Sequence, residues 1–310
     1  MSLFRPGSLR YFVTVAEEGQ VTRAAEKLHL AQPALSQAIA HLEAEVGFKL
    51  FERGPRGVTL TAPGEVFLEK ARAALEAEDD ADQTGRALLR ADQGMLRLGY
   101  MGLPPADMSP DLIEAFVEAN PSVEISEQEL VFPFLPTVSW LGEVDAAICT
   151  RPADDPKVSF QPLSARPRVL LAPKHHRLAE RRELAVAEVL DETFIGFAPS
   201  VDPVWAGIWS LDDHRGAPAP HVTSTSATNV RERFAMIAEG RGVAVAPAPH
   251  ATVVARALRG VVAIPLADAD PAILTLVSRN DRQSLLVKSL FAAARGIAED
   301  ARSPSAATRA

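Results

Sequence analysis

The sequence predicts a multidomain fold in which a winged helix-turn-helix, a long helix and an α/β domain follow one another. Three observations support it. Residues 22–61 have the pattern of two short helices and a glycine-rich hairpin, residues 63–93 have no interior proline, and strand and helix patterns alternate beyond Gly94. A chain of 310 residues has room for two or three such domains.

The two short helices are predicted over residues 22–28 and 33–46. Thr22 is expected to cap the first helix, and Pro33 to open the second at its first position, where a missing N–H costs nothing. Gly47 is expected to end the second helix. One side of this helix is apolar, through Leu35, Ile39, Leu42 and Val46. The opposite side holds Pro33, Gln37, Ala40, His41 and Ala44, with Ser36 on its flank, which suits a helix lying in a major groove.

A short hairpin is predicted after the second helix. Its first strand starts at Phe48, and residues 54–57, Gly-Pro-Arg-Gly, make a tight turn. Arg53 and Arg56 lie at the tip, where a wing would meet phosphate or the minor groove. The alternative is a small helical subdomain whose charges are merely solvated. The order of the elements favours DNA binding.

The N-terminal residues also carry a resemblance to a known family. The matching stretches are Leu9-Arg10-Tyr11-Phe12, Ala16-Glu17-Glu18-Gly19, Thr22-Arg23-Ala24-Ala25, Gln32-Pro33-Ala34-Leu35-Ser36-Gln37, Leu42-Glu43, Gly47, Leu50-Phe51-Glu52-Arg53, Leu60-Thr61 and Gly64. In register, they resemble the start of LysR-type transcriptional regulators. The resemblance is dense over about the first 65 residues. Beyond them, only the order of the predicted helices and strands is similar. It implies promoter DNA and the transcription machinery as partners. We expect DNA contacts from Thr22, Arg23, Gln32, Pro33, Ser36, Gln37, Arg53 and Arg56.

Composition restricts the location and the mode of DNA binding. No apolar run approaches the roughly 20 residues of a membrane span, and the N-terminus lacks the apolar core of a signal peptide. The single cysteine, Cys149, fits a reducing compartment, so a cytoplasmic protein without membrane partners is expected. The net charge is −8, yet residues 1–62 hold seven Lys and Arg against six Asp and Glu. Such a weakly basic unit is expected to need several copies acting together on DNA.

Residues 63–93 are expected to form a linker helix that pairs with a second copy of the chain. Their apolar residues hold helical spacing only approximately: Phe67, Leu68, Ala71, Leu75, Ala81, Leu88 and Leu89. A single exposed helix of this length is poorly stabilised by propensity alone. The alternative is a lone helix bridging two domains through solvent. The resemblance also implies a homodimer, or a homotetramer built from two dimers.

Beyond Gly94 the patterns predict a mostly parallel sheet covered by helices. Strands are expected near 96–100, 123–125, 144–149, 168–172, 193–197, 221–225, 243–246, 261–264 and 272–277, and helices near 110–119, 185–190, 229–239, 251–258 and 284–298. The resemblance implies two lobes like those of periplasmic binding proteins, joined by crossing strands near 158–166 and 261–269. The resulting domains are 1–62, 63–93 and 94–301. Lobe 1 combines 94–161 with 269–301, lobe 2 is 162–268, and 302–310 is a tail without fixed structure.

No enzyme or cofactor signature emerges. Gly-x-Ser-x-Gly, His-Glu-x-x-His and Walker patterns do not occur in the sequence. His175 and His176 read as a solvated loop in preference to a metal site, and Cys149 as a small buried hydrophobe in preference to a redox sensor. We therefore expect a regulator without cofactor or metal whose promoter binding is modulated by a small-molecule effector in the cleft. The alternatives are a periplasmic-type binding protein, which would leave the winged helix unexplained, and a regulator that needs no effector.

The effector is expected to be larger than a small dianion, and mostly apolar or aromatic. The loop after the first α/β strand has no hydroxyl until Ser109, so a dianion would lose hydration without replacement donors. Thr150, Arg151 and Thr228 are expected to orient the effector. The full expected contact set is Gly102, Leu103, Phe132, Thr150, Arg151, Ala198, Pro199, Ser226, Thr228 and Pro247. The alternative is that Leu103 and Phe132 pack the cleft shut.

Overall fold

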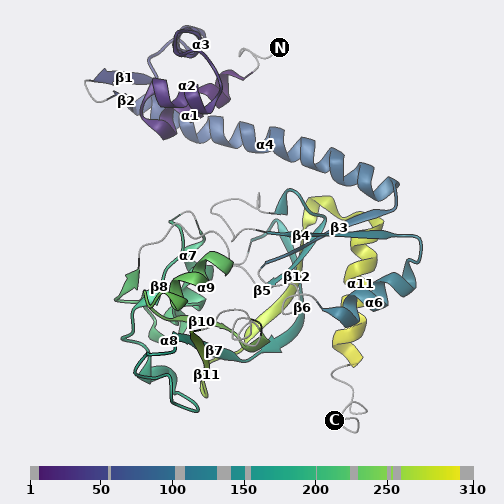
Figure 1. Ribbon diagram of the computed structural model, residues 1–310. Coiled ribbons are helices and arrows are strands. Elements are labelled where there is room, and N and C mark those ends of the chain that lie inside the picture. Colours follow the sequence, from purple (N-terminus) through teal and green to yellow (C-terminus); the bar gives the residue numbers. More distant parts are fainter. Residues whose placement is uncertain are drawn as a thin grey trace. The chain divides into compact units, whose positions relative to one another are not determined.

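The computed structural model describes residues 7–54, 57–101, 109–130, 141–150, 155–199, 201–223, 230–249, 253 and 260–300 (Figure 1). The chain forms two compact units, Met1–Gln83 and Thr84–Ala310. The division falls inside one long helix, α4 (Ala62–Asp92), of which residues 62–83 belong to unit 1 and the last turns to unit 2. Each unit has its own apolar core.

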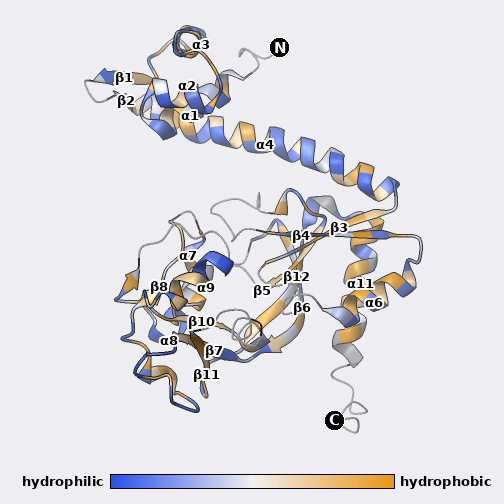
Figure 2. Ribbon diagram, in the orientation of Figure 1, coloured by the Kyte–Doolittle hydropathy of each residue, from blue (hydrophilic) through white to orange (hydrophobic). Residues whose placement is uncertain are grey.

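Unit 1 is a three-helix domain with a hairpin. Its elements are α1 (Ser8–Glu18), α2 (Val21–Lys27), α3 (Gln32–Val46), β1 (Phe51–Gly54) and β2 (Gly57–Leu60). Phe12, Leu35 and Leu42 are fully buried at its centre. The first turns of α4 cover this core with Phe67, Leu68 and Leu75, so the apolar residues of that stretch stabilise unit 1. Figure 2 shows the alternation of apolar and polar residues along α4.

Three local predictions in unit 1 need correction. Gln20, in an extended conformation after the left-handed Gly19, is the N-cap of α2, so Thr22 lies inside the helix and does not cap it. α3 begins one residue before Pro33, which still lies in the first turn where no N–H is needed. β1 begins at Phe51, later than expected. The end of α3 was predicted correctly, since Gly47 takes φ 85° there.

The hairpin is held directly against the turn between α1 and α2. The Val58 N–H donates to the Gly19 carbonyl at 2.8 Å. Gly57 has φ 131°, and a Cβ at this position would lie 2.2 Å from the same carbonyl oxygen. Only glycine therefore fits, and the hairpin is fixed relative to the helices that precede it.

The first sheet of unit 2 has the strand order β4-β3-β5-β12-β6. These strands are β3 (Met95–Tyr100), β4 (Glu124–Glu129), β5 (Ala146–Thr150), β6 (Val158–Arg166) and β12 (Ala272–Arg279). Two helices, α6 (Pro110–Ala119) and α11 (Leu285–Asp300), pack on it through Leu112, Phe116 and Leu290. The last turn of α4 is tied to this sheet, because Arg90 forms two bonds to the Asp145 carboxylate, at 2.6 and 3.2 Å.

The second sheet places β7 (Arg168–Pro173) between β10 (Ala244–Pro247) and β11 (Val261–Pro265). A parallel pair, β8 (Phe194–Ile195) and β9 (Val222–Thr223), joins β10 through a bridge between Phe194 and Val243. The helices here are α7 (Pro203–Ile208), α8 (Asp212–Arg215) and α9 (Val230–Ala238). Single 3-10 turns occupy Val186–Glu188 and Asn280–Arg282.

The expectation of a mostly parallel sheet is correct for β3 with β4 and β5 and for β8 with β9, which pair in parallel. It is wrong for β7 and β12. β7 runs antiparallel to both of its neighbours, and β12 runs antiparallel to β5 and β6. The reason is that the chain passes between the sheets twice, and β12 returns to the first sheet against the direction of β5 and β6. β6 pairs with β12 as far as Arg166, so the first sheet extends past residue 161. The helix expected at 185–190 is only a 3-10 turn, and the one expected at 251–258 lies largely outside the described residues.

Candidate functional site

The outward side of α3 is open to solvent in unit 1. Gln32, Pro33, Gln37 and Ala40 are exposed, and Ser36 is half-buried. The Gln32 side-chain amide donates to the Ser36 hydroxyl at 2.8 Å, which fixes these two polar groups on one face. The predicted outward side of the helix is therefore the exposed side of the structure.

The hairpin adds cations beside this face. A surface hollow is lined by Ser36 and Ala40 of α3 and by Lys49 and Arg53 at the start of the hairpin. Thr22 and Arg23 are exposed in the first turn of α2. Arg56, also expected at the tip, lies outside the described residues. Small polar side chains and cations on one surface can contact base edges and phosphates together.

Glu43 connects α3 to the hairpin. It lies on the inner side of the helix and is 8% exposed. Its carboxylate accepts from the backbone N–H of Leu50 at 2.9 Å and of Phe51 at 3.2 Å, and from the Lys49 ammonium at 2.6 Å. Burial opposes ionisation of Glu43, but these three donors outweigh it, so the pKa of the carboxyl lies below its usual range. The charge of Glu43 thereby holds the hairpin beside α3.

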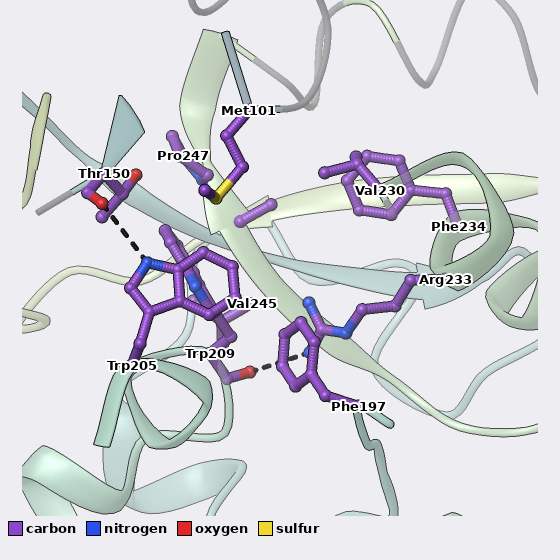
Figure 3. A pocket seen from close by; sticks show the side chains of 11 residues that line it. Met101, Thr150, Phe197, Trp205, Trp209, Val230, Arg233, Phe234, Val245 and Pro247 are labelled. Carbon is purple, nitrogen blue, oxygen red and sulfur yellow. Dashed lines mark hydrogen bonds between the residues drawn. The ribbon is translucent and has the colours of Figure 1, made fainter. Parts of the chain in front are cut away.

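A pocket opens in unit 2 where the two sheets meet (Figure 3). Met101 and Thr150 reach it from the carboxyl ends of β3 and β5, which is the edge where ligands of open α/β sheets bind. The other described lining residues come from the second sheet and its helices: Phe197, Trp205, Trp209, Val230, Arg233, Phe234, Val245, Ala246 and Pro247. The space measures about 390 Å³, counted to its open mouth.

Aromatic rings form one wall of this pocket. The ring centroids of Phe197 and Trp205 lie 5.4 Å apart, and those of Trp205 and Trp209 5.8 Å apart, both pairs close to edge-to-face. The Trp205 indole N–H in α7 donates to the carbonyl of Thr150 at the end of β5, at 3.3 Å, as Figure 3 shows. The wall thus offers flat apolar surface and few acceptors.

Arg233 places a positive charge against this wall. It is 4% exposed, and burial lowers its pKa to about 9, so it remains a cation near neutral pH. Its guanidinium donates to the carbonyls of Ile195 and Trp209 and lies 4.1 Å from the centroid of the Phe197 ring.

Only some of the residues expected to bind an effector line the pocket. Thr150 and Pro247 line the pocket. Ala198 is buried and Pro199 exposed, and neither belongs to the lining. Outside the described residues lie Gly102, Leu103, Phe132, Arg151, Ser226 and Thr228.

Sequence reasoning missed Trp205, Trp209, Arg233 and Phe234 as site residues. A signal for Arg233 was present, since it falls on the same side of its helix as Val230, Phe234 and Ile237, all buried. A charge on the apolar side of a helix needs compensation or marks a site. The two tryptophans, four residues apart, gave a second signal.

The remaining candidates take structural roles. His176 lies 3.2 Å from the Glu192 carboxylate, and the described part of the chain holds no group of three metal-binding side chains. Cys149 is fully buried in β5, as expected of a small hydrophobe. No helix of the described residues is long and apolar enough to cross a membrane.

Comparison with known proteins gives concordant matches. The family described as bacterial regulatory helix-turn-helix protein, lysR family, matches residues 7–65, and the LysR substrate binding domain matches residues 90–298. The Hca operon transcriptional activator HcaR of Escherichia coli is 32% identical, covering 77% of this chain and 80% of that protein. The regulator TfdS of Cupriavidus pinatubonensis is 30% identical, covering 79% and 83%. The crystal structure of CbnR, a LysR family transcriptional regulator, shares the fold, with a TM-score of 0.56 at 22% identity over 96% of this chain and 99% of that one.

Proposed function

The chain belongs to the family of LysR-type transcriptional regulators, and we propose how its residues bind promoter DNA and sense an effector. It is a DNA-binding regulator with an effector-binding domain, and not an enzyme. The proposals below concern the contacts, the domain limits and the effector. Their main support is that unit 1 has an exposed helix face suited to DNA, and that unit 2 has a pocket suited to a small molecule.

In unit 1, α3 lies in the major groove with Gln32, Ser36 and Gln37 facing base edges. Arg53 and Arg56 contact backbone or minor groove at the wing, and Thr22, Arg23 and Pro33 lie against the duplex near the start of the two helices. The supporting observation is the exposed outward side of α3 next to the cations of the hairpin. Gln32 and Ser36 are joined by a hydrogen bond on this side, so both polar groups face the same direction.

Binding assays at several salt concentrations, on selected and random duplexes, test this docking. Gln37→Ala should relax sequence preference by about 1–3 kcal/mol for a lost base contact. Arg53→Ala should weaken all duplexes alike and flatten the salt dependence. Arg295→Ala, on the exposed side of α11 in unit 2, controls for loss of charge. Unchanged affinity and preference in Gln37→Ala would show that the docking of α3 is wrong.

In unit 2, the pocket between the sheets binds a mostly apolar or aromatic effector. The observation that supports this is an open pocket with an aromatic wall at the carboxyl ends of β3 and β5. Calorimetry with compounds from dicarboxylates to aromatic metabolites tests it. Tight binding of a small dicarboxylate that Thr150→Val abolishes would rule out the apolar-effector proposal. A chain that binds none of them would favour a regulator that needs no effector.

Effector binding then shifts the lobes, and with them the arrangement of DNA-binding domains on the promoter. The functional divisions are residues 1–62 for DNA, 63–93 for dimerisation, and 94–301 for the effector, with lobes 94–161 plus 269–301 and 162–268. The tail is 302–310. α4 supports pairing with a second copy, because Val66, Leu88 and Leu89 are 65%, 63% and 57% exposed. We propose that the chain acts in the cytoplasm, as a homodimer or homotetramer that contacts promoter DNA and the transcription machinery.

A further inference from the structure

In the described part of unit 2, the pocket holds a buried cation, Arg233, that pairs with no described carboxylate. Arg233 is the one charged side chain among the described lining residues. No carboxylate of the described residues lies within ion-pair distance of it. Removing a charge from water is costly unless fixed partners replace its hydration, so the surroundings of Arg233 need an anion or several dipoles.

The existing partners of Arg233 satisfy only one side of the guanidinium. Nε and one Nη2 N–H donate to the Ile195 carbonyl, at 3.2 and 3.0 Å, and Nη2 also donates to the Trp209 carbonyl at 3.3 Å. The described residues offer Nη1 no acceptor. In Figure 3 a terminal nitrogen of Arg233 points away from the Trp209 carbonyl, toward the middle of the pocket. Two N–H groups are therefore left for a ligand.

A second buried donor belongs to the same lining. The indole N–H of Trp209 has no hydrogen-bond partner in the described part of the chain. Thr150 adds a hydroxyl at the opposite rim of the pocket. Among the described lining residues, side-chain donors consequently outnumber side-chain acceptors, the reverse of what a cation would need.

The Phe197 ring limits where an anion can bind. It covers one face of the Arg233 guanidinium at 4.1 Å, and the two carbonyls hold the opposite end of the fork. These contacts fix the side chain, so a carboxylate entering at Nη1 meets a donor that is already oriented. A second carboxylate on the same ligand would face Met101, Val245 and Pro247, which cannot solvate it.

We infer that the effector is an aromatic monocarboxylate whose carboxylate pairs with Nη1 of Arg233 while its ring lies against Phe197, Trp205 and Trp209. The inference rests on the proposed function of this pocket as the effector site. The edge-to-face rings of Phe197, Trp205 and Trp209 offer flat apolar surface, which suits a ligand with one ring system. Arg233 is then the residue that selects for a single negative charge.

Calorimetry on the full-length chain tests the inference with matched acid and amide pairs: benzoate and benzamide, phenylacetate and phenylacetamide, indole-3-acetate and indole-3-acetamide. At least one acid should bind about tenfold or more tightly than its neutral amide, because a hydrogen bond to a charged group is worth about 1.5–3 kcal/mol, a tenfold to hundredfold ratio. Arg233→Met should reduce the affinity for the acid to that of the amide. Succinate should bind more weakly than that acid.

Arg231→Met is the matched control, since Arg231 lies two residues away on the same helix and its side chain is 65% exposed. This variant should bind the acid like the wild type. Arg233→Lys keeps the charge but not the fork, and should retain part of the acid preference if Arg233→Met fails to fold. Equal binding of acid and amide, no binding of any acid, or full acid affinity in a folded Arg233→Met would overturn the inference. If a neutral ligand binds tightly and alters DNA affinity, the pocket is still an effector site and only the aromatic-acid inference fails. If an acid binds at Arg233 but has no effect on DNA binding, the binding site is correct and its regulatory role is wrong.

Discussion

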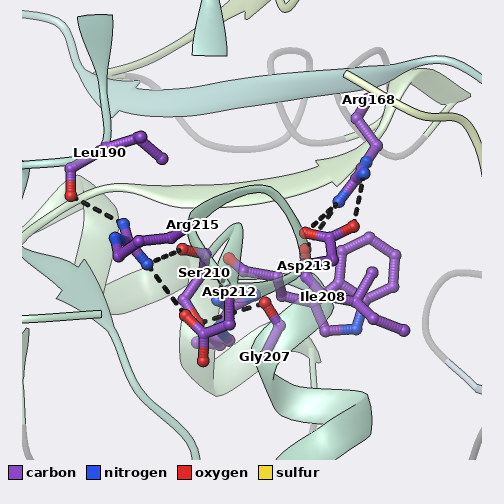
Figure 4. Close-up of polar contacts among 10 residues, drawn as sticks. Arg168, Leu190, Gly207, Ile208, Ser210, Asp212, Asp213 and Arg215 are labelled. Atoms are coloured by element: carbon purple, nitrogen blue, oxygen red, sulfur yellow. Dashed lines mark hydrogen bonds and ion pairs between the residues drawn. The ribbon is translucent and has the colours of Figure 1, made fainter. Parts of the chain in front are cut away.

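Two buried arginines of unit 2 differ in how their charge is matched. Arg168, the first residue of β7, is 2% exposed and forms two bonds to the Asp213 carboxylate, at 2.7 and 3.3 Å (Figure 4). It also donates to the carbonyls of Ile208 and Asp270 and to His214 Nε2. Arg233, equally buried, has carbonyls and a ring but no described carboxylate.

Arg168 is therefore a structural cation, whereas we propose that Arg233 pairs with the carboxylate of a ligand. Arg168 lies where the chain leaves the first sheet, and Asp270 lies in the second crossing, so this ion pair joins α8 to both crossings. The Asp270 backbone N–H also donates to His214 Nε2, which tightens the same junction. A junction between lobes needs a fixed geometry, whereas an effector pocket needs an open donor.

The largest expected effect comes from breaking the structural pair. Asp213→Asn should lower the free energy of unfolding by about 2–4 kcal/mol, because it leaves Arg168 buried without its anion. The lower end is expected, since the Asp213 side chain is 36% exposed. Urea unfolding measures the change. Glu143→Gln is the control, because Glu143 is 61% exposed and 3.7 Å from Arg97, and it should change stability by less than about 0.5 kcal/mol. Equal losses in the two variants would show that Arg168 does not depend on Asp213.

A middle-sized effect is expected in unit 1. Glu43→Gln should cost about 1–3 kcal/mol, because the Leu50 and Phe51 N–H groups and the Lys49 ammonium lose a charged acceptor. The pKa of Glu43 is lower in the folded chain than when unfolded, so its contribution is present above the unfolded pKa and is lost as pH falls through the folded pKa. The difference in unfolding free energy between wild type and variant should therefore begin to shrink as pH falls through the ordinary glutamate pKa of about 4.3, and vanish only below the lowered pKa of the folded chain. A difference that stays constant with pH would contradict this.

The smallest effect concerns the rim of the pocket. Thr150→Val removes one hydroxyl, and should weaken binding of an aromatic acid by about 0.5–1.5 kcal/mol, less than Arg233→Met does. Calorimetry on the two variants side by side ranks the two contacts. A greater loss in Thr150→Val than in Arg233→Met would make Thr150 the main anchor of the carboxylate.

The elements of unit 1 could be predicted from the sequence, whereas most residues of the pocket could not, and the reason is physical. The helices, Gly47 and the hairpin are local features, set by spacing and by residues within one or two turns of each other. The errors there were shifts of one residue at α2 and α3 and of three residues at β1. In unit 2 most strands were located, but antiparallel pairing of β7 depends on partners more than 70 residues away. The placement of Trp205, Trp209 and Arg233 around the pocket likewise depends on contacts between distant segments.

The central claim is that a ligand anchored by Arg233 changes DNA binding, and one titration tests it most directly. The full-length chain is titrated onto its preferred duplex, selected from a random pool, with and without the aromatic acid that binds most tightly. The acid should change affinity or footprint in the wild type and in Arg231→Met, and should leave both unchanged in Arg233→Met. The same acid-dependent change in a folded Arg233→Met variant would contradict the account.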